Sequence, residues 1–123
     1  MLLAAARVFV HDLPAARDFY EQQLGLVIAF DGSTEGFVRF DTGQLQLVLE
    51  SVPPDAPADE QVLVGRFTGL SFGVADLRAE HARLAAAGVR FTGAPEAQFW
   101  GGWLATLADP EGNELQLVQF PQP

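Results

Sequence analysis

Apolar and polar residues alternate in two stretches of this chain, and both stretches read Leu-Gln-Leu-Val, at 45–48 and again at 115–118. An alternation with a period of two predicts a β-strand that is buried on one face. The same pattern predicts three more strands in each half, and apolar residues spaced three and four apart predict one helix in each half. The first half is expected to form strands at 3–10, 26–30, 37–40 and 44–50, and a helix from 13 to 24. The second half is expected to form strands at 67–74, 89–92, 103–108 and 113–120, and a helix at 77–87.

The two halves also share their helix boundaries. Asp12 and Asp76 precede the helices, where a carboxylate can accept a hydrogen bond from a free backbone N–H. Gly25 and Gly88 follow the helices and are typical of helix ends. Because a repeat fixes the architecture, we predict an α+β fold of two tandem βαβββ modules with curled mixed sheets and helices on the outer face. The chain 1–123 is then a single domain, with modules at 1–50 and 67–120.

The segment 51–66 contains three prolines and three acidic residues, which predicts a surface linker between the modules. The chain has 123 residues, no cysteine and a net charge of −9, and no apolar run is long enough for a membrane span. The N-terminus lacks the basic start of a secretory signal, so a cytoplasmic protein is expected. The acidic charge argues against nucleic acid as a partner. It either keeps the protein soluble or attracts a cationic small ligand.

Two short segments of the second half carry a family resemblance. These are Trp-Gly-Gly at 100–102 and Asp-Pro-Glu-Gly-Asn at 109–113, just before the last strand. Together with the tandem modules and the Asp-Leu at each helix start, they resemble the vicinal-oxygen-chelate superfamily. That superfamily includes glyoxalase I, extradiol dioxygenases, fosfomycin-resistance enzymes and bleomycin-resistance proteins. The resemblance implies sheets curled into open cups, a homodimer, and pockets at or near the subunit interface.

Metal-dependent members of this superfamily hold one divalent ion with histidine and glutamate on the first and last strands of the modules. The resemblance places those positions at Ala5, Gln46, Gly69 and Gln116. Alanine and glycine offer no side-chain donor, and transition metals favour imidazole and carboxylate over a neutral amide. We therefore expect neither a metal nor another cofactor. The two histidines do not replace these ligands, since His11 is expected in a surface loop and His81 as a partly buried packing residue on the apolar side of its helix.

Residues two apart on a strand share a face. The residues two away from each expected ligand position are therefore also expected to point into the cup. The two tryptophans lie beside flexible glycines and would suit an aromatic lid over a planar ligand. Packing at a dimer interface explains the tryptophans equally well, and burial against a partner explains the cup face equally well. The expected ligand-binding residues are Arg7, Phe37, Arg39, Gln46, Trp100, Trp103, Glu114 and Gln116.

The leading functional hypothesis is a metal-independent small-molecule binding protein that sequesters an antibiotic-like ligand, cationic or planar, without chemistry. The alternative is an enzyme of the same superfamily, such as a lyase, isomerase, epimerase or dioxygenase. Its active site would be metal-free, with Glu50 or Glu114 as the base, or would use metal ligands at other positions. A third reading is a module that only dimerises or regulates. No catalytic residue is assigned, and no nucleic acid or membrane partner is expected.

Overall fold

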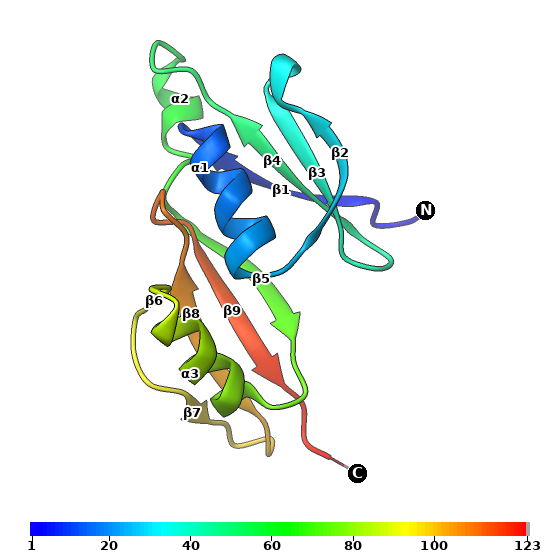
Figure 1. Ribbon diagram of the computed structural model, residues 1–123, viewed down its shortest axis with the longest axis vertical. Helices are drawn as coiled ribbons and strands as arrows, with labels where there is room; N and C mark the ends of the chain where they lie inside the picture. Colours follow the sequence, from blue (N-terminus) through cyan, green and yellow to red (C-terminus); the bar gives the residue numbers. More distant parts are fainter. Residues whose placement is uncertain (123) are drawn as a thin grey trace. The chain divides into compact units, whose positions relative to one another are not determined.

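A computed structural model describes residues 1–122 (Figure 1). Its strands and helices follow the order that the sequence repeat predicts. The chain divides into two units. The first comprises Met1–Arg66 together with Pro110–Asn113, and the second comprises Phe67–Asp109 and the residues from Glu114 onward. Both sheets are mixed, which confirms the predicted α+β fold of two βαβββ repeats. Within the described residues, no helix is both long enough and apolar enough to cross a membrane.

The first unit contains a four-stranded sheet in the order β1-β4-β3-β2, in which only β1 and β4 run parallel. Its elements are β1 Ala5–Val10, α1 Leu13–Asp18, the π-helical turn η1 Phe19–Gln23, β2 Val27–Gly32, the 3-10 turn η2 Ser33–Glu35, β3 Phe37–Asp41, β4 Gln46–Ser51 and α2 Ala58–Gln61. The short helix α2 lies in the segment 51–66, which the sequence had suggested was only a linker.

The second unit repeats this topology with the order β5-β9-β8-β6, in which β5 and β9 run parallel. Its elements are β5 Phe67–Gly73, α3 Leu77–Ala86, β6 Arg90–Phe91, β7 Glu96–Ala97, β8 Trp103–Ala108 and β9 Glu114–Gln119. The two-residue strand β7 pairs with β8 and was not predicted, because it lies in a loop without alternation.

The helix starts form as the sequence predicts. The carboxylate of Asp12 accepts a hydrogen bond from the backbone N–H of Ala15 at 3.1 Å. Asp76 accepts one from Ala79 at the same distance. The first helix, however, is α-helical only to Asp18 and then widens into the π-turn η1. The widened turn carries two adjacent aromatic residues that are both buried, with ring centroids 5.1 Å apart.

The core of each unit lies between its sheet and its long helix. In the first unit α1 covers one face of the sheet (Figure 1). The buried strand residues on that face are Val8, Val10, Val38, Phe40, Leu47 and Leu49. Phe40 on β3 is the strand neighbour of Leu47 on β4.

One buried amide ties together three segments of the first unit. Asn113 is fully buried, and its Nδ2 donates a hydrogen bond to the carbonyl oxygen of Phe9 at 2.9 Å. Its Oδ1 accepts from the backbone N–H groups of Gly65 and Arg66, at 2.8 and 3.3 Å. The turn Pro110–Asn113 therefore belongs to the first unit, although it joins two strands of the second.

We predict that Asn113→Ala strongly lowers the free energy of unfolding. The loss is at least about 2 kcal/mol, since each buried polar group left without its partner costs about 1–3 kcal/mol. Urea unfolding followed by circular dichroism measures the change. Gln22→Ala is the control, because that amide is exposed and donates to the neighbouring Glu21. Equal stability of the two variants would contradict the role of this amide.

Candidate functional site

The face of the first sheet that points away from α1 carries a hollow of about 570 Å³. This first-unit hollow is lined by Glu35, Gly36, Phe37, Arg39, Val48, Glu50, Ser51 and Pro53. A smaller hollow of about 240 Å³ shares Glu50, Ser51 and Pro53 with it, and adds Arg7, Phe9, Val52, Glu60 and Leu63. Both volumes belong to the first unit, and the larger is within the range of small-molecule sites.

Strand register arranges the polar and apolar side chains of this face in two rows. Arg7 on β1, Val48 on β4 and Arg39 on β3 are direct neighbours across the strands. In the next row Glu50 lies between Phe9 and Phe37. The face therefore places guanidinium groups beside aromatic rings over a floor that includes an aliphatic side chain.

The Arg7 charge is neutralised within the site. Its Nε and Nη2 donate to the two carboxylate oxygens of Glu50, at 2.7 and 2.8 Å. This bidentate geometry is the strong form of an arginine–carboxylate pair. The hydrogen bonds to Glu50 and its negative charge raise the pKa of Arg7 above the usual value for arginine. Arg7 also lies 5.1 Å from the ring centre of Phe9.

Arg39 is held differently. Its Nη1 donates to Oε1 of Gln46 at 3.2 Å, and its guanidinium lies 5.2 Å from the ring centre of Phe30. Within residues 1–122, no carboxylate oxygen lies within 4.0 Å of Arg39. The side chain is half-buried, so its positive charge is only partly screened by water. Arg39 thus presents an unneutralised cation to the first-unit hollow.

Two aromatic rings lie beside Arg39: Phe30 is its strand neighbour on β2, and Phe37 ends the row of Glu50. Phe30 and Phe37 are stacked, with centroids 5.7 Å apart and planes at 25°. Phe37 lies directly over the backbone of Gly32, where an added Cβ would be 2.7 Å from the ring. The Phe37 ring can take this place only because position 32 has no side chain.

The residues at the four expected metal-ligand positions do not fit a metal ion. Ala5 and Gln46 are direct strand neighbours, but Gln116 is the neighbour of Ser71, while Gly69 lies in a bulge with φ of +75°. The oxygen of Gln46 already accepts a hydrogen bond from the cation Arg39, which would repel a divalent ion. Among the residues that the structure describes, no three His, Cys, Asp or Glu side chains lie close enough together to bind a metal. We therefore derive no chemistry through a metal.

The predicted residues of the second half lie on the second unit. Gln116 donates from Nε2 to the hydroxyl of Thr106 at 3.2 Å. Both line a polar hollow of about 200 Å³, together with Thr92, Gly93, Ala94, Glu96, Gln98, Leu104 and Ala105. Glu114 is half-exposed two residues earlier on the same strand.

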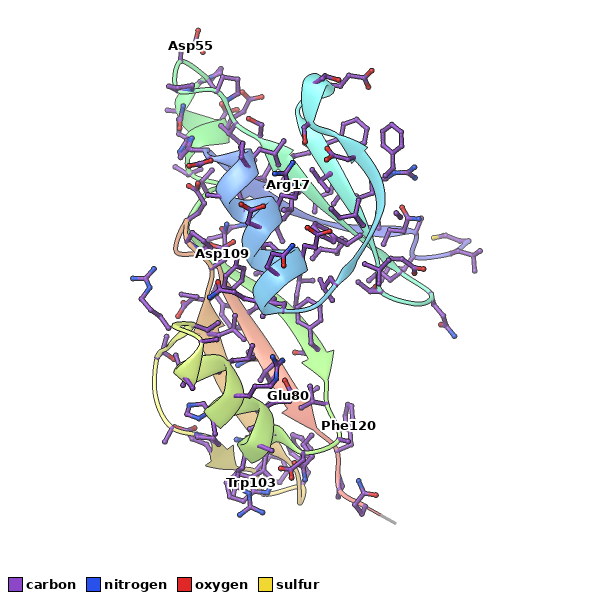
Figure 2. All side chains as sticks on the ribbon, in the orientation of Figure 1. Arg17, Asp55, Glu80, Trp103, Asp109 and Phe120 are labelled. Atoms are coloured by element: carbon purple, nitrogen blue, oxygen red, sulfur yellow. The ribbon has the colours of Figure 1, made fainter. Side chains whose placement is uncertain are left out.

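The two tryptophans differ in their surroundings. Trp103 is at the start of β8, where the guanidinium of Arg78 from α3 lies 4.7 Å from its ring centre (Figure 2). This puts Trp103 on the helix side of its sheet, and we leave it out of the proposed binding face. Trp100 packs on Gly102, where an added Cβ would lie 1.9 Å from the indole, and its ring centre is 6.1 Å from that of Phe120. The indole of Trp100 therefore packs on the backbone of Gly102 within the same loop.

The histidines lie where the sequence suggested. His11 is exposed, and its Nδ1 is 3.0 Å from the carbonyl oxygen of Val52. His81 is half-buried with its ring centre 4.2 Å from that of Phe91, which agrees with a packing role.

Several residues of the site were not predicted. Phe30 reaches the Arg39 side because the pairing of β2 with β3 shifts by one residue between Ile28 and Phe30. Residues of the segment 51–66 line both hollows of the first unit, although its composition indicated only a linker. Pro53, one of the three prolines that suggested a linker, lines both hollows, and the composition alone does not distinguish the two roles.

Comparison with known proteins places this fold in a family. Residues 2–117 match the Glyoxalase/Bleomycin resistance protein/Dioxygenase superfamily. The chain belongs to this superfamily. A Bacillus subtilis (strain 168) protein called "Uncharacterized protein YurT" is 32% identical, over 97% of this chain and 99% of that protein.

Solved structures of the superfamily share the fold over nearly the full chain. A Sphaerobacter thermophilus DSM 20745 member is 31% identical with a TM-score of 0.81, covering 97% of both chains. TnmS3, described as an antibiotic binding protein from Streptomyces sp. CB03234, is 28% identical with a TM-score of 0.77, covering 99% of this chain and 97% of its own. The superfamily resemblance inferred from the repeat and from the segment 109–113 is therefore confirmed.

We predict that Gly102→Ala destabilises this superfamily member and displaces Trp100. An added methyl group would collide with the indole and lie 2.4 Å from the backbone oxygen of Gln119. Overpacking of this kind costs about 1–3 kcal/mol. Tryptophan fluorescence and thermal unfolding report the two effects. Gly93→Ala in the same loop is the control, because a Cβ there meets no atom within 4 Å. A Gly102→Ala protein as stable as this control would show that Trp100 does not depend on the glycine.

Proposed function

We propose that this protein binds a small organic molecule in the first-unit hollow and sequesters it, without a metal and without chemistry. The observation that carries the proposal is the hydrogen bond between Arg39 and Gln46. Gln46 holds an expected metal-ligand position, and its side chain is engaged by Arg39. Arg39 and Phe37 line the hollow beside this contact. The relationship to TnmS3, an antibiotic binding protein, supports an antibiotic-like ligand.

Binding without turnover is favoured over an enzyme by the state of Glu50. A general base needs an oxygen that can reach the proton it removes. Both oxygens of Glu50 are already engaged by Arg7 at 2.7 and 2.8 Å. This pair instead provides a fixed, neutral wall between the two hollows of the first unit. Homodimer assembly and a cytoplasmic location stay predictions from the sequence.

Metal independence predicts that the purified protein contains far less than one transition-metal ion per chain after growth in metal-supplemented medium. Metal analysis by mass spectrometry measures this. The melting temperature should not change on adding EDTA, because no folding energy comes from a bound ion. Stoichiometric zinc, iron, nickel or manganese that disappears in Gln46→Ala would overturn the proposal.

Ligand binding predicts a specific loss in Phe37→Ala. Aromatic compounds are first screened by thermal shift, since a ligand at about 100 times its Kd adds about 2.7 kcal/mol of stability. Loss of the Phe37 ring removes both stacking and buried area, so affinity should fall by about tenfold or more. Calorimetric titration measures the change. Phe99→Ala is the matched control, because that ring is fully exposed. Unchanged affinity in a folded Phe37→Ala protein would place the ligand elsewhere.

A further inference from the structure

We propose that the ligand of the first-unit hollow is a planar aromatic or conjugated molecule that carries a carboxylate or another ionised acidic group, and that Arg39 binds this group. The inference rests on the proposed function, because it names the ligand class of the same site. It replaces the cationic ligand that the net charge of −9 had suggested as one alternative.

Arg39 carries a positive charge that can bind an anion. A guanidinium offers several N–H donors and no acceptor. In the described part of the chain, Arg39 uses Nη1 for Gln46 and has no carboxylate partner. Arg7, the other arginine of this face, is already paired with Glu50 and offers little net charge. An incoming anion would therefore find its strongest partner at Arg39.

The rings of Phe30 and Phe37 lie close enough to Arg39 to bind the same ligand. Arg39 and Phe37 are two residues apart on β3 and share a face, so they are separated by about 6.5 Å along the strand. Phe37 packs against Gly32 and is stacked with Phe30, and Arg39 lies over the same Phe30 ring. A ligand whose ring system lies beside Phe37 can place an acidic substituent at Arg39. Val48, the strand neighbour of Arg39, adds an apolar contact below it.

The negative net charge of the chain does not reverse this preference. Exposed charges farther away than about 8 Å are largely screened at physiological ionic strength. Two other charged residues line the first-unit hollow. Glu50 is neutralised by Arg7, and Glu35 is exposed on the turn at the rim. The half-buried Arg39 is screened less than Glu35, so the local cation decides which ligand charge is favoured.

Three probes with one ring system test the inference by calorimetric titration. They are naphthalene-2-carboxylate, the uncharged naphthalene-2-carboxamide and the cationic 2-naphthylmethylammonium. We expect the carboxylate to bind at least about tenfold more tightly than either of the others, because hydrogen bonds to charged groups are the stronger ones. Binding of the amide or the cation as tightly as the carboxylate would overturn the inference and leave the proposed function standing.

Two variants locate the effect. Arg39→Met keeps the aliphatic stem and should remove the preference for the carboxylate while retaining affinity for the amide. Arg39→Lys keeps the charge and should retain part of the preference, which covers the case in which the methionine variant does not fold. Arg83→Met is the control, since it removes the same charge from an exposed ion pair with Glu80 on α3. A carboxylate preference that survives in a folded Arg39→Met protein, or disappears equally in Arg83→Met, would overturn the inference.

The failure of the proposed function looks different. If none of the three probes binds the wild-type protein at millimolar concentration, and the thermal-shift screen finds no ligand that depends on Phe37, then the hollow is not a binding site. The inference about Arg39 then falls with it.

Discussion

The alternation of side chains along each strand separates the core of this protein from its candidate site. Within the first Leu-Gln-Leu-Val stretch, Leu47 is buried under α1, while Gln46 and Val48 belong to the opposite face. A slip of one residue in strand pairing would exchange these faces and put glutamine into the core. The apolar burial that stabilises the sheet therefore also fixes which polar groups meet at the hollow. Stability and site geometry depend on the same register.

This dependence explains what could be predicted. Burial selects apolar residues at every second position, so the pattern placed Arg7, Phe37, Arg39 and Gln46 on one face of the first sheet, as the structure has them. The pattern failed at Phe30, because a bulge beside Ala29 changes the parity of β2 without any glycine or proline to announce it. Specific partners, such as the pairing of Arg7 with Glu50, depend on side-chain reach across strands and could not be read from the alternation.

Segments without a period were the least predictable. The loop before β8 contains Trp100, whose position is decided by the bare backbone of Gly102 and not by any repeating pattern. The resemblance places Gly69 at the position equivalent to Ala5, yet the bulge in β5 leaves Ser71 opposite Gln116. A count along the sequence assumes equal spacing in both copies, and a positive φ at one glycine is enough to break that assumption.

The same register shows why the two copies of the repeat differ in chemistry despite their shared tetrapeptide. Arg39 is the strand neighbour of Val48, and at the equivalent place in the second unit Leu104 is the neighbour of Val118. Gln46 therefore contacts a guanidinium, whereas Gln116 contacts the hydroxyl of Thr106. The first hollow is lined by Arg39 and Phe37 beside two glutamates, and the second by threonine and glutamine side chains beside one glutamate. Both arginine and leucine fit this strand position without disturbing the core, because the position lies on the face away from the helix, and so the chemistry of the face can differ between the two copies while the fold is the same.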